Sequence, residues 1–262
     1  VTILDSGVTE AGFPYLTTEF FEGGSLHSLI RAAGPLAPAA TLAVGIKIAG
    51  ALETAHRAGV HHRDVKPQNI LLSRFGEPAL GDFGIATTVR EGAGTHSHTG
   101  LTTVHAPPEV ISGGIGGAAA DVYSLASTLY HALAGHSPFV TTDAADAAEG
   151  LEARILTSPV PPLDRPDVPA AVDAILADAL AKDPAARPAT PLELARELQA
   201  LERTIGAPLT SVTCAGESAL AANGVPPSRL VVDVGTPLVV ELEEHPGLDD
   251  AETDPSSRRA GA

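Results

Sequence analysis

The stretch that decides the fold is His62-Arg63-Asp64-Val65-Lys66-Pro67-Gln68-Asn69. Before it, apolar residues recur at helical spacing through residues 39–58, and Gly59 stands where such a helix would end. After it, the apolar run at residues 70–72 predicts a short strand. Residues 62–69 are therefore expected to form a loop that packed elements hold at both ends.

Three side chains of this loop suit phosphoryl transfer, which asks a protein for positioning and electrostatic stabilisation more than for covalent chemistry. The carboxylate of Asp64 can orient an attacking hydroxyl and accept its proton, and the ammonium of Lys66 can lie on the transferring phosphate. Asn69 offers an oxygen of the kind that Mg²⁺ prefers. A second metal ligand is needed, and Asp82 supplies it after a strand predicted at residues 78–80.

These two segments resemble the catalytic loop and the Asp-Phe-Gly metal motif of the eukaryotic-like (Hanks-type) bacterial Ser/Thr protein kinases. The lysine two residues after the aspartate marks the Ser/Thr branch of that family. Further motifs follow in the family's order at residues 106–109, 121–125 and 183–188, and the resemblance covers residues 1 to about 204. It implies an α+β, protein-kinase-like fold: a mostly helical large lobe, with only the last strands of the small lobe present.

The resemblance implies a signalling enzyme that transfers the γ-phosphoryl group of ATP to Ser/Thr hydroxyls of protein substrates, with ATP and Mg²⁺ as cofactors. Asp64 and Lys66 would be catalytic, together with Thr102, whose hydroxyl is expected to contact both. Asn69 and Asp82 would bind the metal. The residues expected at the nucleotide are Thr18 as the gatekeeper, Glu19 and Phe21 in the hinge, and Leu71 beneath the adenine ring.

The family also assigns supporting roles. His62 and Phe83 are expected in a buried hydrophobic stack, Asp121 beneath the backbone of the catalytic loop, and Glu109 in a pair with Arg187. Arg63 is expected to bind a phosphorylated residue of the activation loop, since arginine captures phosphate well; the alternative is a plain surface charge. One departure is His105, which stands where the family commonly has a tyrosine of the peptide-binding surface.

The activation segment is predicted at residues 86–105, a long loop without periodicity that we expect to be autophosphorylated. The candidate acceptors are Thr95, Ser97, Thr99, Thr87 and Thr88. The histidines of this loop, His96, His98 and His105, could suggest a metal site, but no fixed ligand spacing supports one.

Composition narrows the partners. The 262 residues carry a net charge of −16, which disfavours nucleic acid and anionic membranes. A single cysteine fits a cytoplasmic location, and no stretch approaches the apolar length of a membrane helix. The sequence contains no methionine, so we expect it to be a piece of a longer protein that is truncated at its N-terminus.

The chain divides into three parts. Residues 1–24 are expected to be a remnant of the small lobe and the hinge, and residues 25–204 the large lobe. Residues 205–262 would be a C-terminal extension, largely disordered, because the end of the chain is rich in acidic residues, Pro, Ser and Gly.

Two rival functions stay open at this point. The family's Gly-rich loop, its strand lysine and its helix glutamate all belong upstream of the fourth strand, and this sequence has none of them. That favours a non-catalytic pseudokinase or scaffold, although pseudokinases typically lose loop or metal residues that are kept here. A small-molecule phosphotransferase is disfavoured by Lys66, the Ala-Pro-Pro-Glu segment and Arg187.

Overall fold

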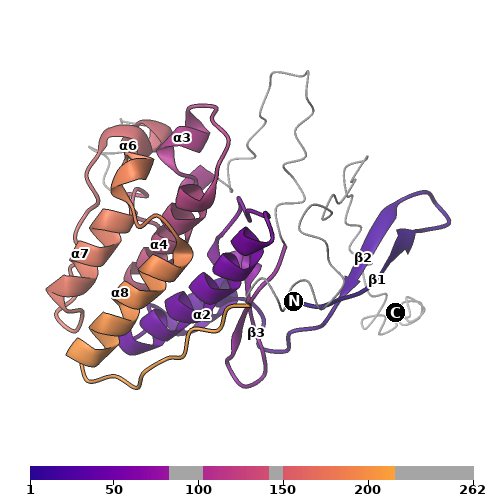
Figure 1. Cartoon of the computed structure of the whole chain (residues 1–262), viewed down its shortest axis with the longest axis horizontal. Coiled ribbons are helices and arrows are strands. Elements are labelled where there is room, and N and C mark those ends of the chain that lie inside the picture. Colours follow the sequence, from indigo (N-terminus) through magenta and orange to yellow (C-terminus); the bar gives the residue numbers. More distant parts are fainter. Residues whose placement is uncertain (83–102, 142–149, 216–262) are drawn as a thin grey trace, which may run out of the picture.

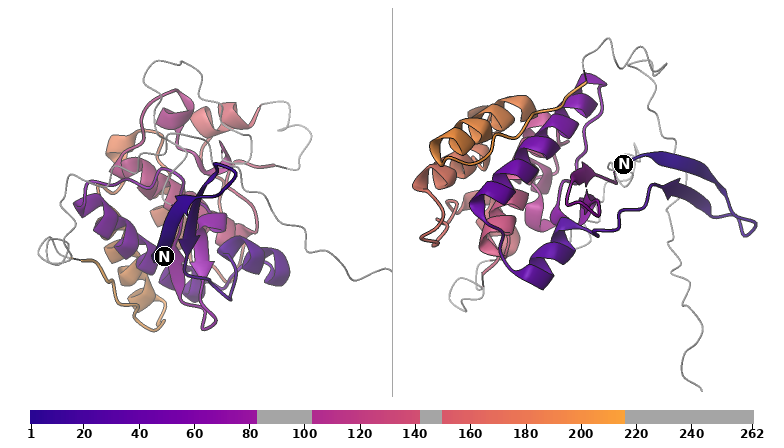
Figure 2. Two further views of the ribbon diagram at one scale, coloured as in Figure 1. Left: turned by 90° about the vertical axis from the view of Figure 1, so that its right-hand side faces the viewer. Right: turned by 90° about the horizontal axis from the view of Figure 1, so that it is seen from below.

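The computed structural model describes residues 1–82, 103–141 and 150–215. Strands β1 (Ile3–Val8) and β2 (Pro14–Thr18) form an antiparallel hairpin, with Ile3 opposite Thr18 and Val8 opposite Pro14. The hairpin stands away from a helical body (Figures 1 and 2). From the sequence alone, residues 6–12 predict a turn, but β1 continues to Val8 because residues 6–8 pair with β2. The turn is confined to residues 9–12 and ends on Gly12, whose φ of 87° favours glycine.

Two helices follow the hairpin. Helix α1 (Leu26–Ala33) begins at the predicted N-cap Ser25, whose hydroxyl accepts a hydrogen bond from the backbone N–H of Ser28. Helix α2 (Pro38–Arg57) begins with a proline, which suits the first turn because its missing N–H would have no partner there. Just beyond its end, Gly59 has a φ of 76° and turns the chain toward residues 62–69.

The 62–69 loop leads into a second small sheet. A single 3₁₀ turn, η1 (Pro67–Asn69), closes the loop, and strand β3 (Ile70–Leu72) pairs antiparallel with β4 (Pro78–Leu80). Both strands have the predicted bounds. Ile70 is fully buried beneath the loop, so the loop is held at both ends by packed elements, as predicted.

The rest of the described chain is helical. The apolar pattern of residues 168–181 predicts a helix over that range, but α7 is shorter, because Pro169 serves as its N-cap and Leu180 as its C-cap. The elements in order are η3 (Thr103–His105), α3 (Pro108–Ile111), α4 (Ala118–Ala134), α6 (Leu151–Thr157), α7 (Ala170–Ala179), η4 (Pro184–Ala186) and α8 (Pro191–Thr204).

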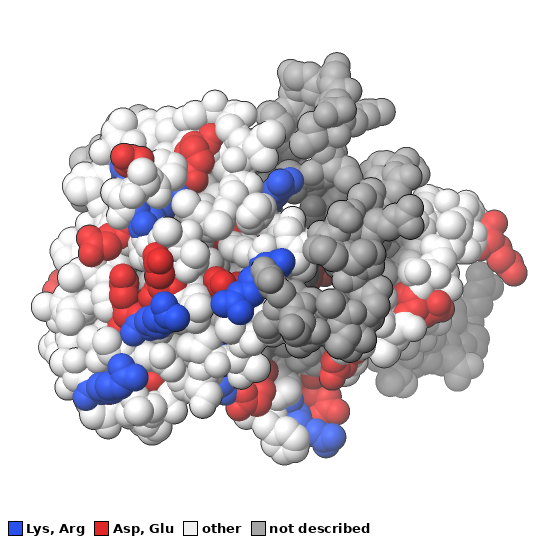
Figure 3. Space-filling model, in the orientation of Figure 1, with Lys and Arg blue, Asp and Glu red and all other residues white. Residues whose placement is uncertain are grey.

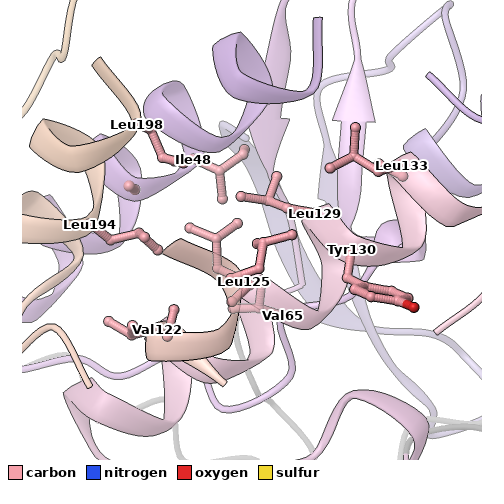
Figure 4. Close-up of a cluster of buried hydrophobic side chains, with 14 of the residues drawn as sticks. Ile48, Val65, Val122, Leu125, Leu129, Tyr130, Leu133, Leu194 and Leu198 are labelled. Carbon is pink, nitrogen blue, oxygen red and sulfur yellow. The ribbon is translucent and has the colours of Figure 1, made fainter. Parts of the chain in front are cut away.

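The core lies where α4 packs between α2, α7 and α8 (Figure 4). Aliphatic side chains fill it, as the 3% aromatic content requires. Helix α4 is buried around most of its circumference, and Leu125 and Leu129 are at most 1% exposed. The helices approach closely at Gly45 of α2, where an added Cβ would lie 2.7 Å from Leu129 and 2.9 Å from Leu198.

Charges are unevenly spread. Figure 3 shows acidic and basic side chains interspersed over the helical body, whereas residues 1–24 contain four acidic residues and no Lys or Arg.

Residues 205–215 follow α8 and lie against α2 and α8. Within the part of the chain described, the helices are too short or too polar to cross a membrane.

Candidate active site

The 62–69 loop brings three of the predicted site residues together. The Nζ of Lys66 lies 2.7 Å from Oδ2 of Asp64, and Nδ2 of Asn69 donates to the same oxygen at 3.0 Å. Asn69 also donates to the backbone carbonyl of Asp64 at 2.8 Å. Both donors therefore converge on Oδ2, and among the described residues Oδ1 of Asp64 is the carboxylate oxygen left for an incoming hydroxyl.

His62 fixes the loop from beneath. It is fully buried, its Nε2 lies 2.9 Å from the carbonyl oxygen of Gly81, and its Nδ1 accepts from the backbone N–H of Asp64. Burial lowers the pKa of the imidazole below its ordinary value, so the ring is neutral and donates from Nε2. His62 thereby ties the backbone before Asp82 to the backbone of Asp64.

Asp121, at the start of α4, holds the other end of the loop. Its side chain is fully buried and accepts from the backbone N–H groups of His62 at 2.8 Å and Arg63 at 2.7 Å. Arg63 has a φ of 62°, a conformation that costs about 1–3 kcal/mol for such a residue. The two charge-assisted bonds to Asp121 offset that strain. The Arg63 side chain is exposed, with Nε donating to the carbonyl of Gly116.

Asp82 follows directly on this network. Its neighbour Gly81 donates its backbone N–H to the carbonyl of Asn69 at 2.9 Å. This hydrogen bond holds the backbone that leads into Asp82 next to Asn69. Asp82 is exposed and has a φ of 51°, again strained for a non-glycine residue. These oxygens fit Mg²⁺, because the amide nitrogen of Asn69 donates to Asp64, so the Oδ1 of Asn69 faces elsewhere and can act as a ligand together with the exposed carboxylate of Asp82.

The four residues predicted at the nucleotide are less tightly gathered. Thr18 and Glu19 are exposed at the end of β2, where the N–H of Glu19 donates to the carbonyl of Thr2. Phe21 is half-buried and precedes a Gly-Gly turn. Leu71 lies on β3, and its side chain borders Gly81. The structure thus places Leu71 beside the metal-motif backbone and Thr18 and Glu19 at the base of the hairpin.

Glu109 and Arg187 form a bidentate ion pair. The two guanidinium nitrogens Nη1 and Nη2 donate to Oε1 and Oε2 of Glu109 at 2.7 and 2.8 Å. The remaining N–H groups of Arg187 donate to the backbone carbonyls of Ala119, Ala181 and Lys182, so all five donors are used. The pair therefore ties α3 to the start of α4 and to the η4 segment.

His105 is buried at the end of η3, facing α4. Its Nδ1 lies 2.8 Å from the hydroxyl of Ser127, its carbonyl accepts from Ser124, and its ring stacks on His131 at 5.5 Å. Burial, with a smaller contribution from His131, Lys66 and His27, lowers its pKa to about 3. Burial likewise lowers the pKa of His131 to about 4. Both rings are therefore neutral at physiological pH.

Several predicted residues lie outside the described part of the chain. They are Phe83, Thr102, the acceptor candidates Thr87, Thr88, Thr95, Ser97 and Thr99, and the histidines His96 and His98. In residues 1–82, 103–141 and 150–215, no group of three or more His, Cys, Asp or Glu side chains could hold a metal ion.

Sequence reasoning missed two supporting histidines. His56 on α2 brings Nε2 within 2.7 Å of Oδ2 of Asp121, which gives that carboxylate a third partner. His131 stacks on His105. Both are single histidines within helical patterns, and no local spacing sets them apart from the others among the ten in the chain.

A mostly helical lobe, a buried aspartate beneath a His-Arg-Asp loop and a Glu–Arg pair beyond it together define the large lobe of a protein kinase. The protein kinase domain family matches residues 1–199, and this chain belongs to that family. The Hanks-type fold class predicted from the sequence is thereby confirmed.

The relatives are bacterial Ser/Thr kinases. The chain is 42% identical to Serine/threonine-protein kinase PknK of Mycobacterium tuberculosis over 209 residues, which is 79% of this chain and 18% of the relative. It is 35% identical to PknL of the same organism over 213 residues, 79% of this chain and 52% of PknL. It is 38% identical to PknH of Mycobacterium bovis over 198 residues, 74% of this chain and 32% of PknH. The chain thus spans about half or less of these relatives.

Proposed function

We propose that this chain carries the catalytic lobe of an enzyme that transfers the γ-phosphoryl group of ATP to Ser or Thr hydroxyls of protein substrates. The observation that carries the proposal is the convergence of Lys66 and Asn69 on a single oxygen of Asp64. That arrangement leaves the other carboxylate oxygen for a substrate hydroxyl and keeps a cation beside it. The names of the relatives support Ser/Thr specificity.

The residues divide the chemistry between them. Oδ1 of Asp64 would orient the substrate hydroxyl and take its proton as the oxygen attacks the γ-phosphorus and the bond to the β-phosphate oxygen breaks. Lys66 would stabilise the charge on the transferring group. Asn69 and Asp82 would hold Mg²⁺, which when bound neutralises charge on the phosphates. Thr102 is proposed to contact Asp64 and Lys66, and Thr18, Glu19, Phe21 and Leu71 to border the adenine.

Regulation is proposed at Arg63. Its backbone is fixed by Asp121 while its guanidinium is exposed at the surface of the loop. A phosphate added by autophosphorylation within residues 86–105 would find a charged, bidentate partner there. Such a contact would order the activation segment over the catalytic loop.

The alternative function is a non-catalytic binding module. The lysines among residues 1–82 are Lys47 and Lys66, and Lys47 lies on α2, paired with Glu77 of the β3–β4 turn. Lys47 therefore has a structural partner, and we do not propose it as a ligand of the nucleotide phosphates.

Labelled ATP with Mg²⁺ distinguishes a kinase, which would transfer the label to protein, from a non-catalytic binding module, which would not. Incubation of the chain with γ-labelled ATP, Mg²⁺ and a mixed protein substrate should place label on phosphoserine and phosphothreonine, and chelation of Mg²⁺ should abolish it. Absence of label on both substrate and chain would reject transfer by this chain and favour the binding module. Label in a small molecule alone would indicate a small-molecule phosphotransferase.

A further inference from the structure

The segment that follows α8 does not leave the lobe directly. Figure 1 shows it running from the end of α8 along α2 toward β3; we call residues 207–215 the strap. At its start, Thr210 donates its N–H and its hydroxyl to the two carboxylate oxygens of Glu202 at 2.8 and 2.6 Å. Gln199 donates to the carbonyl of Thr210 at 2.7 Å. Glu202 is only 1% exposed, so a buried carboxylate of α8 is committed to the strap.

The strap ends on the last turns of α2. The Thr54 hydroxyl accepts from the N–H of Ala215 at 3.1 Å while donating to the carbonyl of Gly50. Nη1 of Arg57 donates to the carbonyl of Ala215 at 3.4 Å. These contacts use the main chain of the strap, so this face of α2 binds backbone groups of the strap.

Gly50 explains how that backbone comes so close. Apart from proline, glycine is the least favourable residue in a helix interior, yet Gly50 lies well inside the 20-residue helix α2. A Cβ added there would lie 2.5 Å from the carbonyl oxygen of Thr213. That atom is backbone and cannot rotate away as a flexible side chain could. Alanine at position 50 and a docked strap are therefore incompatible without a shift of the main chain.

We propose that the face of α2 formed by Gly50, Thr54 and Arg57 is a docking surface for the strap, and that docking steadies the turn leading into the catalytic loop. His56 lies in that same last turn and contacts Asp121, which holds the loop backbone. The docking surface thus connects the region after the kinase lobe to the support of Asp64. The functional lobe then includes residues 207–215 and does not stop at the end of α8.

A sign reversal tests the docking. In the intact 262-residue chain, Gly50→Ala should lower Tm, because it excludes the strap. The same substitution should raise Tm by about 2–4 °C in a full-length chain whose residues 207–215 are replaced by a Gly-Ser sequence of equal length, because only helix propensity then acts. Thermal unfolding of the four proteins gives the coupling directly.

Gly45→Ala is the matched control on the same helix. Its Cβ would meet the side chains of Leu129 and Leu198 and not the strap, so it should lower Tm equally in both backgrounds. An equal effect of Gly50→Ala in both backgrounds would overturn the docking proposal.

Hydrogen exchange tests the link to the loop. Amides of residues 54–58 should exchange faster in Gly50→Ala than in wild type, and unchanged exchange there would overturn the link. Both readouts are independent of phosphoryl transfer, so their failure is distinguishable from failure of the proposed activity.

Discussion

At the scale of single residues, Asp121 does the most to shape the site. It accepts from two consecutive backbone N–H groups and contacts His56, and one of those N–H groups belongs to the strained Arg63. In an Asp121→Asn variant, the amide N–H₂ that replaces one carboxylate oxygen would face a backbone N–H group, and two donors cannot form a hydrogen bond. The geometry of the loop that carries Asp64 therefore depends on a fully buried carboxylate.

We expect Asp121→Asn to lower the free energy of unfolding by about 2 kcal/mol, since hydrogen bonds to charged groups contribute roughly 1.5–3 kcal/mol. Phosphoryl transfer should fall as well, because Arg63 can relax and release the loop. Urea unfolding measures the first effect. Asp178→Asn, an exposed carboxylate on α7, is the control and should change neither quantity. Equal stabilities of the Asp121 and Asp178 variants would contradict this account.

His105 makes stability depend on pH. Its pKa is lowered to about 3 in the folded chain. Between pH 3 and 6.5, His105 therefore binds a proton in the unfolded chain but stays neutral in the folded chain. Stability contributed by the neutral ring is thus present above pH 6.5 and lost as the pH falls. Between pH 6.5 and 5.5 the loss should be about 1 kcal/mol from His105, and His131 acts in the same direction.

Denaturant unfolding at the two pH values checks this dependence. His105→Gln keeps a polar partner for Ser127 and removes the titration, so its stability should change less over the same interval. Identical changes in wild type and variant would show that His105 is not responsible.

At this scale, the sequence alone indicates that the candidate catalytic residues lie together, but it gives no sign of every residue that supports them. Asp64, Lys66 and Asn69 lie within six residues, so local spacing alone places them together. His56 and Asp121 are 65 residues apart and meet only through the packing of α2 on α4. No local pattern encodes such a pairing.

At the scale of elements, the Glu109–Arg187 pair joins α3 to the start of α4 and to the segment before η4. Arg187→Lys keeps the charge but replaces a planar fork with five donors by a single ammonium. A lysine cannot supply all five donors, so buried backbone carbonyls would lose their partners. We expect a loss of about 1–3 kcal/mol of stability, the cost of leaving buried polar groups unsatisfied.

The matched control is Arg196→Lys, an exposed arginine on α8. Chemical unfolding of both variants gives the comparison. A cost below 1 kcal/mol for Arg187→Lys would show that the pair is dispensable.

Element boundaries followed from sequence where short-range rules dominate. Strands β3 and β4 have the predicted bounds, since turns mark their ends. β1 extends through residues 6–8 because these residues pair with β2, and pairing is a property of two segments. Such extension cannot be read from one strand alone.

At the scale of the whole molecule, stability resides in the helical body. Leu129 of α4 is 1% exposed, whereas Leu4 of the hairpin is 64% exposed. Leu129→Ala should cost about 2–5 kcal/mol through lost burial and the cavity left behind. Leu4→Ala, the same change in the hairpin, should stay within about 0.5 kcal/mol. Comparable losses in the two variants would contradict a core centred on α4.

The class of fold could be predicted for residues 1 to about 204 because ordered motifs span residues 62–188. The strap could not, since residues 207–215 carry no periodicity and dock through main-chain atoms. Gly50, which allows the strap to approach, lies inside α2, and from the sequence alone a glycine there indicates only a less stable helix.

The central claim is that Asp64 handles the proton of a substrate hydroxyl, and single-turnover transfer tests it most directly. With ATP and Mg²⁺ saturating, Asp64→Asn should slow transfer to a Ser/Thr protein by about 10²–10⁴-fold, the usual contribution of a general base. ATP affinity should be unchanged, and Asp178→Asn should retain the wild-type rate. A wild-type rate in the Asp64→Asn chain would contradict the account.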